Sequence, residues 1–161
     1  MLELRIEHAG PELRAMAARL RRAGDPARMR RLMLAGLKEG VKPAVRQAKS
    51  AALTLPSHGS HHSGFRRKLA RTINAQVRTS GRDPGVRVRI SKARMGDQAS
   101  LATATNKGRW RHPVYGNRSV WVTQTSRRAW FDDANRYNGP PVRRALQRVL
   151  DDMERELSRH L

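Results

Sequence analysis

The chain has 161 residues, of which 38% are hydrophobic and only 4% aromatic, so the length fits one domain over 1–161 with a modest core of Leu, Val, Ala and Met. The absence of cysteine excludes disulfides, thiol catalysis and Cys-based zinc sites, and no apolar run is long enough for a signal core or a membrane span. The formal charge of +21 points to a polyanionic partner or an acidic neighbouring subunit.

The first two expected elements are a strand and a helix. Residues 2–8 alternate apolar and charged side chains, which is the period of a half-buried strand. Residues 11–22 carry apolar side chains at helical spacing, and Gly24 closes that segment. We therefore expect a short strand followed by a first helix.

A long second helix is expected over 25–52. Asp25 can accept hydrogen bonds from free backbone N–H groups, and Pro26 is tolerated in a first helical turn because its missing donor is not needed there. Pro43 lies inside the apolar pattern, where it removes one backbone hydrogen bond. The sequence therefore predicts a kinked helix.

Residues 55–64 have the composition of a loop and contain the one histidine cluster of the chain, at His58, His61 and His62. Nearby imidazoles can share a transition metal. No cysteine exists, and no carboxylate lies close in sequence, while Ser and Gly surround the histidines. A solvated loop is therefore favoured over a metal site, and the expected metal ligands and cofactors are none.

The centre of the chain predicts a third helix and two strands. Apolar residues recur every four positions over 65–77, which predicts the helix. Residues 86–90 alternate apolar and basic side chains, which predicts a strand with Arg87 and Arg89 on a basic face. A second strand is expected over 100–105.

Residues 106–128 mix Gly, Pro and basic residues with large aromatics, and we interpret them as an ordered loop carrying a short strand over 120–123. A helix is expected from residue 129, interrupted over 138–141, with a resumed C-terminal helix that ends the chain. The predicted class is α+β, with long N-terminal helices, a small antiparallel sheet, a long ordered loop and a C-terminal helix.

The aromatic and basic residues of this loop admit two interpretations. Trp, Tyr and Arg are enriched at protein interfaces, so the loop can anchor a neighbouring subunit. Arg interleaved with rings is also the footprint of nucleic-acid binding. The predicted interface residues are Trp110, Arg111, His112, Tyr115, Arg118, Trp121 and Trp130, and the predicted basic surface comprises Arg87, Arg89 and Arg109.

Catalysis is not indicated by the residues. Asp132 and Asp133 are adjacent, so on a helix they point about 100° apart, and they fit a helix start better than an acid/base pair. No serine lies in a nucleophile elbow, and no glycine loop has phosphate-cradling spacing. We expect a protein that is not an enzyme and has no catalytic residues.

Most of the chain resembles a phage protein family. The earliest matching piece runs from Leu55-Pro56 to Ser63-Gly64-Phe65-Arg66, followed by Arg111-His112-Pro113-Val114-Tyr115-Gly116-Asn117-Arg118, Trp121-Val122-Thr123-Gln124 and Ala129-Trp130-Phe131-Asp132-Asp133-Ala134. Together these motifs resemble the neck and tail-completion proteins of siphophages, the long-tailed bacteriophages. The histidine-rich loop departs from the pattern of that family.

The resemblance implies a structural protein of the phage particle. Such a subunit would form a homo-oligomeric ring, a hexamer, that joins the tail tube to the capsid connector and contacts neighbouring connector and tail proteins. It would reside in the head–tail neck of the virion after assembly in the host cytoplasm, and its basic surface could meet genomic DNA in the channel. A tail terminator, a head–tail stopper and a basic nucleic-acid-binding protein are the alternatives.

Overall fold

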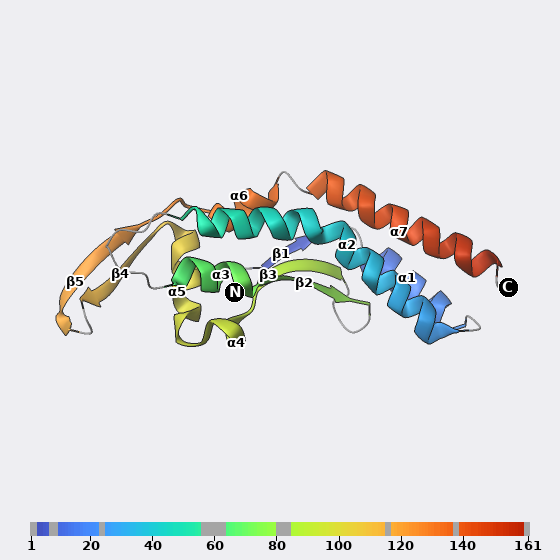
Figure 1. Cartoon of the computed structure of the whole chain (residues 1–161), viewed down its shortest axis with the longest axis horizontal. Helices are drawn as coiled ribbons and strands as arrows, with labels where there is room; N and C mark the ends of the chain where they lie inside the picture. Colours follow the sequence, from blue (N-terminus) through green and yellow to red (C-terminus); the bar gives the residue numbers. More distant parts are fainter. Residues whose placement is uncertain are drawn as a thin grey trace.

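The computed structural model describes residues 3–6, 10–22, 25–55, 64–79, 85–114, 117–136 and 139–159. These residues form an α+β fold, as predicted (Figure 1). In chain order the elements are β1 (Glu3–Ile6), α1 (Gly10–Leu20), α2 (Pro26–Leu53), α3 (Phe65–Thr72), β2 (Ile73–Arg78), β3 (Gly85–Ile90), α4 (Lys92–Met95), the short 3-10 helix η1 (Gly96–Gln98), α5 (Ala99–Lys107), β4 (Arg109–Val114), β5 (Asn117–Thr125), α6 (Trp130–Arg136) and α7 (Gly139–Arg159).

Helix α2 is the longest element, and its main contacts are with α1, α3, α6, α7, β2 and β3. It starts as predicted, because the Asp25 carboxylate accepts a hydrogen bond of 2.9 Å from the backbone N–H of Arg28 and Pro26 occupies the first turn. Figure 1 shows α2 bending partway along its length, as expected for a helix with Pro43 inside it. The bend lets one half of α2 contact α1 and α7 while the other half contacts α3 and α6.

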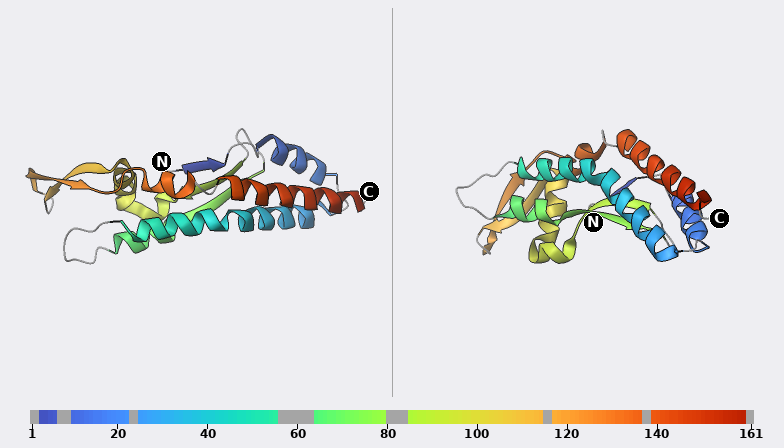
Figure 2. Two further views of the ribbon diagram at one scale, coloured as in Figure 1. Left: turned by 90° about the horizontal axis from the view of Figure 1, so that it is seen from above. Right: turned by 45° about the vertical axis from the view of Figure 1, so that its right-hand side comes forward.

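Helices α1, α2 and α7 lie side by side at one end of the molecule (Figure 2). Helix α7 approaches α2 closely at two glycines: a Cβ atom added to Gly36 would lie 2.9 Å from Val149 Cγ1, and one added to Gly40 would lie 3.2 Å from Ala145 Cβ. Larger side chains at these positions would push the helices apart. In the described part of the chain, no helix has both the length and the apolar character needed to span a bilayer.

The three-stranded sheet is antiparallel with the order β1-β3-β2, and β2 and β3 contact α2. The predicted strands at 2–8 and 86–90 are confirmed as β1 and β3. The prediction of one helix over 65–77 is wrong in its second half, because α3 ends at Thr72 and Ile73 starts β2, paired with Ile90. A spacing of four residues fits one face of a strand as well as one face of a helix, since four is a multiple of two.

Two further predictions are corrected between residues 99 and 125. The strand expected over 100–105 is helix α5, in which the Thr105 hydroxyl donates to the carbonyl oxygen of Ala102. The ordered loop expected over 106–128 is mostly the β-hairpin formed by β4 and β5. The interruption predicted over 138–141 is confirmed in part, because α6 ends at Arg136 and α7 begins at Gly139.

The core consists mainly of Leu, Met, Ala and Val, as the composition predicted. Its largest side chains are nevertheless aromatic. Trp130 and Phe131 are 2% and 0% exposed, and their rings meet edge to face with centroids 5.7 Å apart. The two adjacent rings fix the start of α6 against the rest of the core.

Candidate functional site

The hairpin formed by β4 and β5 extends from the end of the molecule opposite α1 and α7 (Figures 1 and 2). Its strands pair in register from Arg109 opposite Thr125 to Pro113 opposite Trp121, where a bulge shifts the pairing. Outside the hairpin its main contact is between β4 and α5. The hairpin is therefore held at its base and is open along its length.

The hairpin exposes three consecutive large apolar side chains. Val120, Trp121 and Val122 are 50%, 48% and 38% exposed. Elsewhere in the described residues the large exposed apolar side chains are Leu32 and Leu53, which are separated along α2. Single exposed apolar residues are normal, whereas a contiguous exposed group marks an interaction surface.

Beyond the base of the hairpin, the described residues cover neither face of β5 around Trp121. On one face the guanidinium of Arg111 lies over the Trp121 ring, 5.8 Å from the centroid, and the indole N–H donates to the carbonyl oxygen of Arg118 at 2.8 Å. Val120 and Val122 alternate with Trp121 and belong to the other face. A partner can therefore reach apolar side chains from both sides.

The base of the hairpin is closed by a polar cluster that joins the end of α5 to the start of α6. Asn106 donates to Asp132 at 2.8 Å, and its side-chain oxygen accepts from the backbone N–H of Phe131 at 2.9 Å. The Ser126 hydroxyl donates to the carbonyl oxygen of Thr105 at 2.5 Å. These bonds fix the direction in which the hairpin leaves the molecule.

Sequence reasoning missed this cluster, although a signal for it was present. Gly108 ends α5 with a φ of 87°, and a Cβ atom there would lie 2.8 Å from Arg128 Cβ. Glycine after a helix is a common stop signal because it adopts positive φ without strain. Asn106-Lys107-Gly108 is therefore a helix end followed by a strand.

The structure brings most of the predicted interface residues together on the hairpin. Arg111, Arg118 and Trp121 are exposed, as is Arg109 of the predicted basic surface, and Trp110 is half-buried with its indole N–H unpartnered among the described residues. The backbone of His112 lies opposite Val122, and Tyr115 lies outside the described residues.

Two predicted site residues are corrected by burial. Trp130 is 2% exposed within its own chain, and its indole N–H donates to the Thr105 hydroxyl at 3.3 Å, so it is a core residue and not an interface residue. Arg87 is 7% exposed because β3 is the central strand and its neighbours flank it on both sides. Arg89 on the same strand is half-buried. The predicted basic face of this strand is thus mostly covered.

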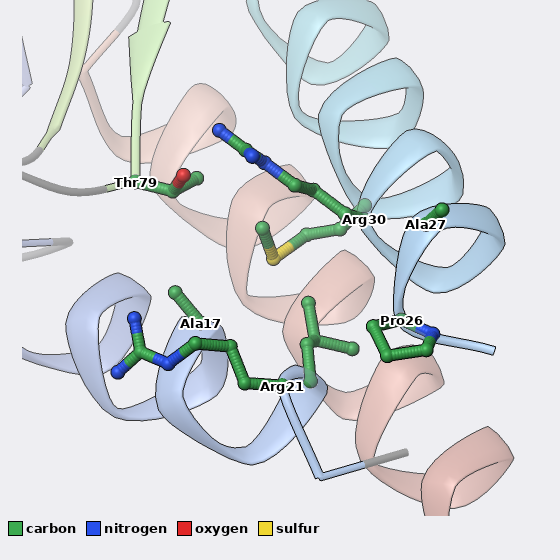
Figure 3. Close-up of a pocket in the computed structure, with 8 residues that line it drawn as sticks. Ala17, Arg21, Pro26, Ala27, Arg30 and Thr79 are labelled. Carbon is green, nitrogen blue, oxygen red and sulfur yellow. The ribbon is translucent and has the colours of Figure 1, made fainter. Parts of the chain in front are cut away.

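A first hollow lies between α1 and the start of α2, with a volume of about 360 Å³ (Figure 3). Apolar side chains make up most of its lining, and Arg21, just after α1, and Arg30 of α2 also line it. The residues around it are Ala17, Leu20, Arg21, Pro26, Ala27, Arg30, Met33 and Thr79. No carboxylate or histidine lies among them, so this set does not supply an acid/base pair.

A second hollow has a volume of about 570 Å³ and is strongly basic. We call it the basic hollow, and it is lined by Gly64, Arg67, Lys68, Arg71, Thr72 and Arg94. Sequence reasoning missed it. The pattern of 65–77 indicated only an apolar helix face, and it did not show that the basic residues of this segment lie close to Arg94. Its four cations come from α3 and α4, which contact one another in the fold.

The described residues contain no group of three or more His, Asp or Glu side chains placed to hold a metal ion. His58, His61 and His62 lie outside the described residues. In comparisons with known proteins, no family model, no curated protein and no solved structure matches the chain.

Proposed function

We propose that the chain is a structural subunit of the head-to-tail region of a long-tailed phage particle, where it forms a ring with other copies of itself. The observation that carries the proposal is the hairpin, which exposes Val120, Trp121 and Val122 beyond the body of the fold. The motifs that resemble neck and tail-completion proteins include Trp121 and Val122, so the resemblance and the exposed surface overlap at these two residues.

The stability of a two-stranded hairpin depends on what packs against its faces. Such a hairpin is marginal in water when neither face is packed, and its edges invite pairing with another chain. The polar cluster at its base fixes its direction, with Ala129 N–H donating to the Asn106 carbonyl oxygen at 2.7 Å. A directed arm at one end of an elongated subunit suits a head-to-tail contact, which closes into a ring when the rotation permits.

The first test measures assembly in solution. We expect the purified chain to form ring-sized oligomers in sedimentation velocity and negative-stain images, and Trp121→Ala to shift it to smaller species. Leu53→Ala is the matched control, because Leu53 is 47% exposed and Trp121 is 48% exposed. A chain that stays monomeric at high concentration, or a control that disassembles equally, would contradict the proposal.

The second test measures assembly in the particle. In a phage that encodes this chain, its removal should leave filled heads and finished tails that fail to join, as seen by negative stain. Complementation with the chain should restore joined particles, and complementation with Trp121→Ala should not. Normal particles without the chain would show that it has another role.

Two neighbouring roles in the same stack, tail terminator and head–tail stopper, fit the same surface. They are distinguished by what the defective particles look like. If the chain were a terminator, we would expect its loss to give tails of uncontrolled length; if it were a stopper, we would expect heads that lose their DNA. We place the chain at tail completion, with no catalytic step and no cofactor.

A further inference from the structure

We infer that the basic hollow between α3 and α4 binds the phosphate backbone of double-stranded DNA. The hollow brings together three arginines and one lysine, and no residue that lines it is acidic. Four like charges held around one space repel each other, and an anion bound among them would offset that repulsion. Because a single chain carries all of these residues, the inference does not depend on ring assembly.

Among the described residues, the cations of the hollow have few acidic partners. Lys68 Nζ lies 3.8 Å from Asp97 Oδ1, but the Asp97 side chain is 90% exposed and the pair is weak. No ion pair joins Arg67, Arg71 or Arg94 to an acid in the described part of the chain. The nearby Arg66 donates to the carbonyl oxygen of Leu55 at 3.0 Å. Its guanidinium is therefore hydrogen-bonded outside the hollow.

Their backbone positions are fixed before any ligand arrives. Leu69 is fully buried, which orients α3 so that Arg67 and Arg71, one turn apart, share the exposed side. The Ser91 N–H donates to the Thr72 carbonyl oxygen at 3.0 Å and joins the start of α4 to the end of α3. Arg94 is thereby presented across the hollow, next to the buried Met95.

The chemistry favours a phosphate backbone over a single small anion. Arg67 and Arg71 repeat at about one helical turn, roughly 5 Å, so they can contact successive charges of a polymer. Duplex DNA offers about one negative charge per 1.7 Å of its axis. Arginine also donates two parallel hydrogen bonds to phosphate, and three of the four cations here are arginine.

The test measures how DNA affinity depends on salt. Anisotropy of a labelled duplex of about 25 base pairs, between about 50 and about 200 mM NaCl, gives the slope of log K against log salt. We expect the triple variant Arg67→Gln, Arg71→Gln, Arg94→Gln to reduce the magnitude of this slope by about 2 to 3, at about 0.9 per lost phosphate contact, and to weaken binding roughly tenfold or more.

The control removes the same charge from another surface. Arg143, Arg144 and Arg148 are exposed on α7, and changing all three to Gln also removes three positive charges. We expect this control to weaken binding less than about threefold. Equal losses in the two triple variants would show that only the overall charge matters and would overturn the inference.

Further variants and competitors test the source of the anion. Replacing the three arginines of the hollow by lysine should keep the salt slope, because lysine keeps the charge. Loss of the slope in a variant whose circular dichroism spectrum is unchanged would overturn the assignment to charge. Displacement of the duplex by inorganic phosphate at constant ionic strength would identify a small-anion site instead. Equally tight, hollow-dependent binding of poly-glutamate would identify an acidic protein partner and overturn the assignment to DNA.

Discussion

The helical end of the molecule and the hairpin use apolar residues in opposite ways. In α1, α2 and α7 the apolar stripes face one another, and Leu13, Leu37 and Leu146 are at most 2% exposed. In β5, Val120, Trp121 and Val122 stay in solvent. Three helices can cover each other's apolar stripes, whereas two strands alone can cover neither face of their hairpin.

Charge is distributed with the same contrast. Near the helical end, three of the four acids of α7 pair with arginine, as in Arg19 to Glu154 at 2.5 Å and Arg159 to Glu156 at 3.3 Å. Around the basic hollow, Asp97 is the one described acid within ion-pair distance of a lining cation. More of the apolar side chains and acidic groups at the helical end are thus paired within the described chain than at the hairpin and the basic hollow.

The largest expected effect is the loss of a core side chain at the helical end. Leu37→Ala removes a fully buried side chain between α2 and its neighbours, so we expect the free energy of unfolding to fall by about 2 to 5 kcal/mol. Urea unfolding followed by circular dichroism measures this loss. Leu53→Ala, at an exposed site on the same helix, should lower it by less than about 0.5 kcal/mol.

The close approach of α2 and α7 gives the second prediction. Gly36→Ala places a methyl group 2.9 Å from Val149 Cγ1. We expect this overpacking to lower the free energy of unfolding by about 1 to 3 kcal/mol, and the higher helix propensity of Ala to offset about 1 kcal/mol of that loss. In a Val149→Ala background the clash disappears. The same substitution should then stabilise the protein by up to about 1 kcal/mol, and additivity of the two changes would refute the close contact.

The N-terminus of α2 gives a smaller effect. Asp25→Ala removes the acceptor for the Arg28 backbone N–H, and we expect a loss of about 1 kcal/mol in thermal or urea unfolding. Asp25→Asn keeps a side-chain oxygen at the same place and should retain most of the stability. If both variants lost stability equally, the carboxylate charge and not the cap would be responsible.

The smallest expected effect on stability belongs to the hairpin. Trp121→Ala, measured under conditions that keep the chain monomeric, should change the free energy of unfolding by no more than about 0.5 kcal/mol, because the side chain is already 48% exposed. The same variant is expected to prevent assembly. A large loss in the monomer would mean that the hairpin stabilises the fold itself, and the contrast between the two regions would fail.

Sequence reasoning succeeded where one periodicity was unambiguous. The apolar stripe of α2, with its Asp25-Pro26 start, gave the helix almost to the residue, and the alternation at 86–90 gave β3. It failed at Ile73 and Val77, whose spacing suits both a helix and a strand. It also failed over 100–105, where Ala favours a helix and Thr favours a strand, and the structure forms α5 there.

The candidate site was predicted in its residue types but not in its shape. The sequence identified a segment of tryptophan and arginine, yet it did not distinguish a loop from a hairpin, because the pairing of β4 with β5 depends on contacts between strands. Trp110, Trp121 and Trp130 look alike in the sequence. The fold leaves Trp121 exposed and puts Trp130 in the core, since Trp130 lies in α6, which packs on α2.

The sequence alone determined the α+β class, the long proline-bent helix, the aliphatic core and the excess of positive charge, because each follows from local periodicity or from composition. Tertiary structure alone decided which arginines share one hollow, which tryptophan is free to meet a partner, and which glycines let α7 lie against α2. Those properties depend on residues far apart in the chain coming within a few ångströms of each other. The pattern within a single segment does not indicate which distant residues will come into contact.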